Sequence, residues 1–183
     1  SVCLYSKNNL KRGLKCLGLG IALTIITFLF FKNMIIYFGI LHFLGVSMII
    51  YALLEKWFKK IKPSVLIIVG IVLFFVTFGV PEGYINIFFS KIYLPQVKNN
   101  LLMPLGFVTK HFYSADYFSL LPWFFIFISG IGFGKLLKEE RLPKFFYNSH
   151  IKFLSVIGRN TIWIYILHQP IIFILLTFIF NNV

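Results

Sequence analysis

Five long apolar runs dominate this sequence, and each is close to the roughly 20 residues that an α-helix needs to cross a bilayer. The runs exceed the usual length of a strand and lack its period-two alternation. In lipid, the backbone polar groups of each run must be satisfied within a helix. The sequence therefore predicts an all-α fold, a transmembrane bundle of about five spans in a single membrane domain. The spans lie approximately at residues 14–31, 35–54, 64–80, 119–137 and 154–180.

Composition excludes an ordinary soluble domain. Hydrophobic residues make up 59% of the 183 residues and charged residues only 13%, against about 25% charged in soluble domains. The formal net charge of +13 is compatible with nucleic-acid binding. However, the bases lie between the apolar runs, as a membrane topology requires. We therefore expect a bilayer partner and no nucleic acid.

The basic residues gather in three regions of the chain, which predicts its orientation. By the positive-inside bias these regions are cytoplasmic, so the N-terminal flank is inside and the C-terminus outside a multi-pass protein of the plasma membrane. The three groups are Lys7, Lys11, Arg12 and Lys15 before the first run; Lys56, Lys59, Lys60 and Lys62 after the second; and Lys135, Lys138, Arg141, Lys144, Lys152 and Arg159 after the fourth.

Residues 81–118 form the one long connection, which this topology places outside. A loop of this length is usually functional or disordered. The stretch GYINIFF at residues 83–89 and the scattered aromatic residues favour an ordered segment that leans on the membrane surface. Pro95 and Pro104 interrupt any continuous helix there.

Metal and nucleotide motifs are missing from the sequence. Cys3 and Cys16 have no metal-site or disulfide-framework spacing. We also find no dinucleotide fingerprint, P-loop, zinc-protease motif or hydrolase elbow. We therefore predict no metal site.

Two histidines lie inside predicted spans, where ionisable groups usually face the bundle interior or a cavity. His42 is the eighth residue of its span, at a depth of about 12 Å at 1.5 Å per residue. His168 lies near the middle of the last span. A histidine titrates near neutral pH, so either residue could relay a proton or activate a hydroxyl or amine. The alternative is a neutral histidine that hydrogen-bonds between helices.

Other polar residues near the spans have two interpretations each. Arg159, beside Asn160, could bind a phosphate or carboxylate or simply anchor the cytoplasmic side. Gln169 precedes Pro170, which either opens a cavity or makes an ordinary kink. Asp116 could cap the helix at 119–137, or orient a base or a substrate amine.

Five motifs along the chain resemble those of a known family. They are KRGLK at 11–15, FGILH at 38–42, DYFSLLPW at 116–123, GRNT at 158–161 and YILHQP at 165–170. Together they resemble bacterial relatives of heparan-α-glucosaminide N-acetyltransferase, which are multi-span membrane acyltransferases. The resemblance extends from about residue 11 to residue 180.

The resemblance implies transfer of an acetyl group from cytoplasmic acetyl-CoA to an amine or hydroxyl of a sugar or glycan across the membrane. His42 and His168 would then be catalytic, with His42 nearer the acceptor. The family's first span, with a Leu-Arg-Gly motif and a histidine, would precede Ser1, which suggests that the chain is a fragment. The residues expected to bind substrate are Asp116, Trp123, Arg159, Asn160 and Gln169.

Other functions stay open at this point. One is a type-3 O-acyltransferase of cell-surface polysaccharide. Another is a transporter in which His42, His168 and Arg159 form a proton or anion path, although the halves show no inverted symmetry. A third is a structural membrane protein without catalysis. The sequence also leaves open whether copies of the chain associate.

Overall fold

The structure is a computed structural model, and the chain divides into two units, residues 1–141 and 142–183. In the first unit it describes residues 2–5, 8–87, 90–95 and 97–141. In the second unit it describes residues 142, 143, 147, 157, 160, 161, 164, 165, 167, 168, 171, 175, 178 and 179.

The first unit contains four helices that are long and apolar enough to cross a membrane. These are α2 (Asn9–Phe30), α3 (Ile40–Lys60), α4 (Pro63–Thr77) and α5 (Leu120–Lys138), and the short α1 (Val2–Tyr5) precedes them. The candidate span that contains α4 continues to Glu82. The prediction of a polytopic helical membrane protein is thus confirmed. The fifth predicted span falls mainly on residues outside those described.

The starts of α2 and α3 differ from the sequence prediction. Helix α2 begins at Asn9, and the side chain of Asn8 caps it by accepting from the Lys11 amide (3.4 Å). Helix α3 begins at Ile40 rather than at residue 35. Residues 35–38 are apolar but pair with a distant part of the chain, so hydropathy alone placed the start of this helix too early.

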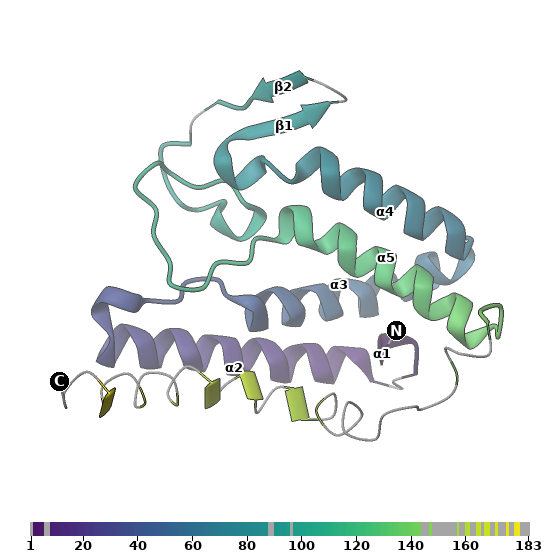
Figure 1. The fold of residues 1–183 in the computed structure, drawn as a ribbon, viewed down its shortest axis with the longest axis horizontal. Helices are drawn as coiled ribbons and strands as arrows, with labels where there is room; N and C mark the ends of the chain where they lie inside the picture. The colour runs from purple at the N-terminus through teal and green to yellow at the C-terminus, as the bar shows by residue number, and fades with distance from the viewer. Residues whose placement is uncertain are drawn as a thin grey trace. The chain divides into compact units, whose positions relative to one another are not determined.

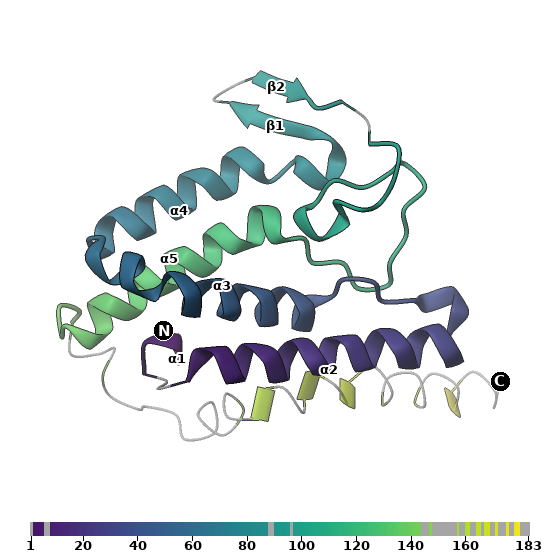
Figure 2. The same cartoon turned by 180° about the vertical axis from the view of Figure 1, so that it is seen from behind.

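The four long helices form two antiparallel pairs, α2 with α3 and α4 with α5 (Figures 1 and 2). A glycine permits close approach in each pair. A Cβ at Gly45 would lie 2.6 Å from the backbone nitrogen of Leu17, and a Cβ at Gly70 would lie 2.6 Å from the carbonyl oxygen of Phe125. Small residues commonly allow such contact between membrane helices.

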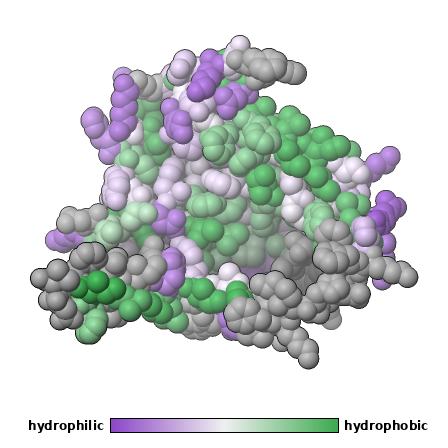
Figure 3. Space-filling model, viewed as in Figure 1, coloured by the Kyte–Doolittle hydropathy of each residue, from purple (hydrophilic) through white to green (hydrophobic). Residues whose placement is uncertain are grey.

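The long connection between α4 and α5 is ordered over its described part and carries a β-hairpin. Strands β1 (Tyr84–Ile87) and β2 (Ser90–Tyr93) are antiparallel, with Tyr84 opposite Tyr93. Two 3₁₀ turns, η2 (Val80–Glu82) and η3 (Met103–Leu105), flank them. Figure 3 shows hydrophilic residues around the hairpin and apolar residues over α4. The hairpin is an addition to the helical fold that the sequence analysis did not predict.

In the second unit, residues 157, 160, 161, 164, 165, 167, 168, 171, 175, 178 and 179 are helical. The hydroxyl of Thr161 donates to the carbonyl of Ile157 (3.1 Å), one turn earlier. These positions lie within the predicted span at 154–180.

Candidate functional site

His42 lies in the first turn of α3 and is only 6% exposed. Its Nδ1 accepts a hydrogen bond from the amide of Gly39, the N-cap residue (3.3 Å). This is the half of a capping box in which the N3 side chain bonds back to the N-cap amide. Because Nδ1 accepts, the neutral imidazole carries its proton on Nε2.

The Nε2–H group of His42 points at a hydroxyl on the neighbouring helix. Thr24 of α2 lies with Oγ1 3.3 Å from Nε2, and the same hydroxyl donates to the carbonyl of Ile36 at 2.6 Å. Since the Thr24 proton is used in that second bond, the threonine oxygen accepts from Nε2–H. A directed chain thus runs from His42 through Thr24 to the backbone of Ile36.

The imidazole of His42 packs flat against α2 at Gly20. A Cβ at Gly20 would lie 3.0 Å from Nδ1 and 3.1 Å from two ring carbons. Gly20 and Thr24 are one turn apart on the same helix face. Neither residue was predicted from the sequence, although a glycine and a threonine at i and i+4 in an apolar helix were the available signal.

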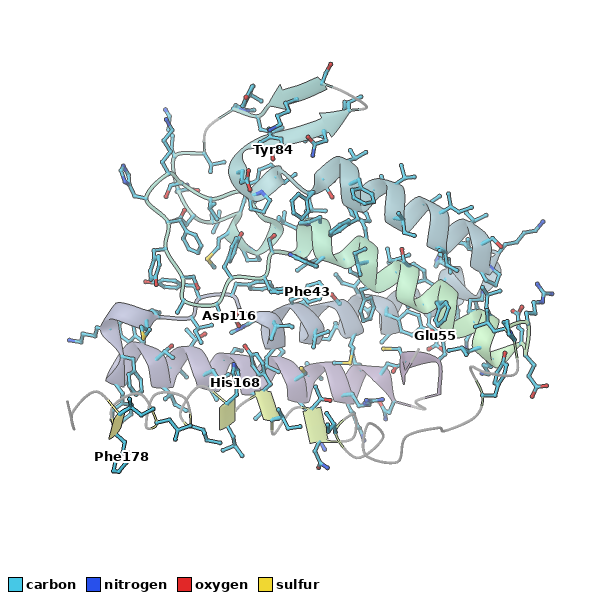
Figure 4. All side chains as sticks on the ribbon, viewed as in Figure 1. Phe43, Glu55, Tyr84, Asp116, His168 and Phe178 are labelled. Atoms are coloured by element: carbon cyan, nitrogen blue, oxygen red, sulfur yellow. The ribbon has the colours of Figure 1, made fainter. Side chains whose placement is uncertain are left out.

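Asp116 caps α3 rather than the helix that follows it in sequence. Its Oδ2 accepts from the amide of Ile40 at 3.2 Å, and Figure 4 shows it beside the start of α3. The prediction that Asp116 caps the 119–137 helix is therefore wrong. A carboxylate at this position is favourable because the amino end of a helix carries partial positive charge.

The placement of Asp116 comes from pairing between two extended segments, residues 35–38 and 114–118. Phe38 and Tyr117 form a parallel bridge. The amide of Ala115 donates to Ile35 (3.1 Å), and that of Phe118 donates to Phe38 (2.9 Å). Because this pairing occupies residues 35–38, His42 lies only about 3 Å along the helix from its first residue, at 1.5 Å per residue. The expected depth of about 12 Å is therefore wrong.

Trp123 lies at the same end of the helices but in an apolar aromatic cluster. Its ring is 4.5 Å from Phe118 and 5.5 Å from Phe74 of α4, measured between centroids. Phe118 in turn packs on Phe43 of α3 (5.6 Å). Trp123 therefore packs behind the segment at residues 114–118, which carries Asp116.

Tyr117 anchors the same segment from outside the helices. Its hydroxyl donates to the carbonyl of Met103 at 2.7 Å. Burial raises the pKa of Tyr117 to about 12, partly opposed by a hydrogen bond with Ser119. The phenol is therefore protonated at physiological pH.

In the second unit, His168 has its own defined tautomer. Its Nδ1 is hydrogen-bonded to the carbonyl of Tyr165, and its ring lies 5.4 Å from the tyrosine ring. A carbonyl can only accept, so the proton is on Nδ1 and Nε2 keeps its lone pair. Asn160 is helical and exposed. Arg159 and Gln169 lie outside the described residues.

Within the described part of the chain, no group of three His, Cys, Asp or Glu side chains could hold a metal ion. In the first unit the site offers the imidazole of His42, the hydroxyl of Thr24 and the carboxylate of Asp116. Such groups can donate to a developing oxyanion or accept a proton from a nucleophile.

Comparison with known families gives a match over most of the chain. The sequence model described as heparan-alpha-glucosaminide N-acetyltransferase, catalytic, matches residues 2–170. A search of curated proteins and a search of solved structures gave no match.

Proposed function

The chain belongs to the heparan-α-glucosaminide N-acetyltransferase catalytic family, and from this premise we propose that it moves an acetyl group from acetyl-CoA to an amino or hydroxyl group of a sugar across the membrane. The family is one of membrane acetyltransferases, and the four apolar helices fit that class. Acetyl-CoA is the donor substrate in this proposal, and the acceptor is a sugar or glycan.

The observation that carries the proposal is the Nε2–H group of His42. This group is buried in an apolar bundle, and its hydrogen-bond partner, the hydroxyl of Thr24, can be replaced by a substrate oxygen. The contact with Thr24 is 3.3 Å, long for a hydrogen bond whose usual length is about 2.9–3.0 Å. The carbonyl oxygen of the acetyl group would take the place of Thr24. In the tetrahedral intermediate that oxygen becomes negative, and His42 would stabilise it as a donor.

His168 is suited to the complementary role of general base. Its Nδ1 is bonded to Tyr165, so Nε2 can take a proton from the acceptor amine or hydroxyl. The nucleophile then attacks the acetyl carbonyl, the C–S bond breaks, and the proton taken up by His168 passes to the sulfur, so that coenzyme A leaves as a thiol. The hydrogen bonds of each histidine within its own unit support these two proposed roles.

The remaining residues are assigned to positioning and to binding. Asp116 holds the start of α3, and with it the position of His42. We assign Arg159 to the phosphates of coenzyme A, with Asn160 and Gln169 beside it. We assign Trp123 to the part of the site that binds the acceptor, where it packs behind the other residues.

The proposed orientation places the His42 end of α3 outside the cell. Its opposite end carries Lys59 and Lys60 in the last turn, which the positive-inside bias puts in the cytoplasm. The acceptor would then approach His42 from outside, in a plasma-membrane protein whose N-terminal flank is cytoplasmic. Accessibility of single cysteines introduced at Lys32 and Lys62 to an impermeant reagent on intact cells tests this orientation.

The direct test is transfer of labelled acetyl from acetyl-CoA to glucosamine by the purified chain in lipid nanodiscs. We expect His42→Gln to lower turnover about 10²- to 10³-fold, as for loss of an oxyanion donor. Glutamine retains an acceptor for the Gly39 amide, so the helix start is preserved. His168→Ala should cost about 10²- to 10⁴-fold.

The matched control is His111→Gln, an exposed histidine in the outer connection, and it should keep full turnover. Absence of any acetyl-CoA-dependent product from the wild-type chain would refute the proposed function. Normal turnover in His42→Gln would remove the imidazole from the mechanism.

A further inference from the structure

The β-hairpin folds back beside the last turns of α4 instead of projecting beyond them (Figures 1 and 2). The ring of Tyr84 lies so close to Gly79 that a Cβ there would clash with it, and the amide of Tyr84 donates to the carbonyl of Gly79 (3.0 Å). Two residues along β1, the side-chain amide of Asn86 donates to the carbonyl of Phe75, one turn earlier in α4 (3.3 Å). Strand β1 therefore runs antiparallel to α4.

The contact with Phe75 places Asn86 within the membrane-spanning length of the helix. The candidate span runs from Pro63 to Glu82, so Phe75 lies about 10 Å before its end at 1.5 Å per residue. The carbonyl of Phe75 belongs to the last turn of α4, whose carbonyls lack a partner within the helix. Asn86 thus supplies a hydrogen bond that lipid cannot supply.

The two faces of the hairpin differ in polarity. Side chains alternate along a strand, and directly opposed residues share a face. The face toward α4 carries Tyr84, Asn86 and Lys91, and the ammonium of Lys91 lies 4.4 Å from the centroid of the Tyr84 ring. The opposite face carries Ile87 and Ile92, which are 47% and 51% exposed.

This arrangement is the reverse of that expected in water. An antiparallel sheet with one solvated face normally packs its apolar face on the protein and turns its polar face to the solvent. In this hairpin the polar face packs on α4 and the isoleucine face points away from the helix. The surroundings of the isoleucine face should therefore be apolar.

The apolar surroundings of α4 are the hydrocarbon of the bilayer. Ile68, Val72 and Phe75 follow one another at helical spacing, and each is more than half exposed. Figure 3 shows apolar residues over this helix. Since β1 is hydrogen-bonded to the last turn of α4, its isoleucine face continues the lipid-facing surface of the helix.

The open edge of the sheet limits how deep the hairpin can lie. Within the part of the chain that the structure describes, β2 pairs only with β1. An open sheet edge does not occur inside the hydrocarbon, because its backbone groups would lack partners there. At the boundary between headgroups and acyl chains, water reaches the edge while apolar side chains are buried by about 5–10 Å.

We propose that the hairpin is inserted into the lipid leaflet at this end of the helices, with Ile87 and Ile92 against the acyl chains and the open edge among the headgroups. In the proposed orientation this is the outer leaflet. The sequence predicted only that this segment leans on the membrane surface, whereas its contacts with α4 define which face enters the lipid and how deep. The inference does not depend on the enzymatic role.

The test is a measurement of spin-label accessibility on the full chain in lipid nanodiscs. Oxygen concentrates among the acyl chains and a nickel chelate stays in water, so the ratio of their collision rates with a label reports its surroundings. With the buried Cys3 and Cys16 replaced by alanine and serine, single labels are placed at Ile92, at Val72 in α4 and at the exposed Lys110. We expect the oxygen-to-nickel ratio at Ile92 to be severalfold above that at Lys110 and below that at Val72.

Two results at Ile92 would overturn the proposal. A ratio equal to that at Lys110 would mean that the isoleucine face lies in water. Few collisions with either reagent would mean that a protein partner or a second copy of the chain covers this face.

A charge on the isoleucine face should expel the hairpin from the lipid. We expect Ile87→Asp to lower the ratio at Ile92 severalfold, toward the value at Lys110. The matched control, Asn99→Asp, adds the same charge at an exposed residue outside the hairpin, and its carboxylate can still accept from the amide of Leu101 (3.4 Å). It should leave the ratio unchanged, and an equal ratio in both variants would contradict insertion of this face.

Discussion

Both helix pairs pack closely at a glycine, but they differ in the hydrogen bonds that polar side chains form between the helices. In both α2–α3 and α4–α5 a glycine brings the backbones close together, at Gly45 and at Gly70. In α4–α5, the hydroxyl of Ser129 bonds to the backbone carbonyls of Ile67 (3.2 Å) and Phe125 (3.1 Å). In α2–α3, by contrast, a side chain bonds to a side chain, His42 to Thr24.

This difference separates a polar contact that only stabilises helix packing from one that can also bind a substrate. The hydroxyl of Ser129 uses its one proton on helix carbonyls, so it has no donor left for a substrate oxygen. A histidine bonded to a hydroxyl keeps a donor that a substrate oxygen can take over. We therefore expect changes in α4–α5 to affect stability, and changes around His42 to affect activity at nearly constant stability.

The largest expected effect is on stability, for Gly70→Ala in α4. The new methyl group would lie 2.6 Å from the carbonyl oxygen of Phe125, so the helices must separate. Overpacking of this kind costs about 1–3 kcal/mol. Thermal unfolding in one detergent should show a lower midpoint, with normal turnover per folded molecule.

Gly130→Ala is the matched control for Gly70→Ala, because a Cβ at Gly130 meets nothing within 4 Å. Its midpoint should equal that of the wild type or exceed it. Equal losses in the two variants would mean that helix contact at Gly70 is not the cause.

The next effect is on activity, for Thr24→Val in α2. Valine has a similar shape but no hydroxyl, so the Nε2–H of His42 loses its partner and the imidazole is no longer fixed. We expect acetyl transfer to fall about tenfold, equivalent to about 1.4 kcal/mol. Thr24→Ser, which keeps the hydroxyl, should restore most of the rate.

The ¹⁵N NMR shifts of His42 provide an independent measurement for Thr24→Val. All three proteins should show protonated Nε2, because the Gly39 amide still donates to Nδ1, but in Thr24→Val the Nε2 shift should move to that of an N–H group without a hydrogen-bond partner. An unchanged Nε2 shift with a lowered rate would contradict the proposed link between the two residues.

A smaller effect on activity is expected for Gly20→Ala compared with Gly18→Ala. The first adds a methyl group about 3.0 Å from the His42 ring, whereas the second meets nothing within 4 Å. The ring must shift by a few tenths of an ångström, so we expect a severalfold loss of turnover at position 20 and none at position 18. Similar rates would show that the ring position is not critical.

The smallest effect is pH-dependent and concerns Tyr117→Phe. The folded pKa is about 12, above the value of about 10 in an unfolded chain. The protonated phenol therefore stabilises the fold fully below pH 10, and this contribution is lost as pH rises through 12. The substitution should cost about 1 kcal/mol at pH 7, and the gap between the unfolding midpoints should narrow at pH 11. A gap that does not change with pH would exclude this role for the hydroxyl.

The sequence was sufficient to predict four of the five proposed spans, because apolar spans depend on local composition. It failed at residues 35–38, where an apolar stretch is extended. Their partner, residues 114–118, is nearly 80 residues away, and hydropathy carries no information about such pairing. The same pairing explains why Asp116 caps α3 rather than the adjacent helix.

The candidate site was predictable only in part. His42 stands out because a histidine is rare in an apolar run. Thr24 does not, since threonine in a membrane helix commonly bonds to its own backbone, as Thr27 does with Leu23 (2.9 Å). Only the position of Ile36, which accepts from Thr24, turns that hydroxyl toward His42.

Helix α3 is held at both ends by groups that belong to α5 or lead into it. Asp116 accepts from its first amide. At the other end, the ammonium of Lys135 donates to the carbonyls of Phe58 (3.2 Å), Lys59 (3.1 Å) and Ile61, which uses all three of its protons. Each charge has the sign that stabilises its end of the helix.

These two contacts restrict α3 to one length. One residue added to α3 would move its last carbonyls by about 1.5 Å and rotate them by about 100°, away from Lys135 if Asp116 stayed bound. The separation between the two caps thus allows one length of α3. It thereby fixes how far His42 lies from the end of α3 that Lys135 binds.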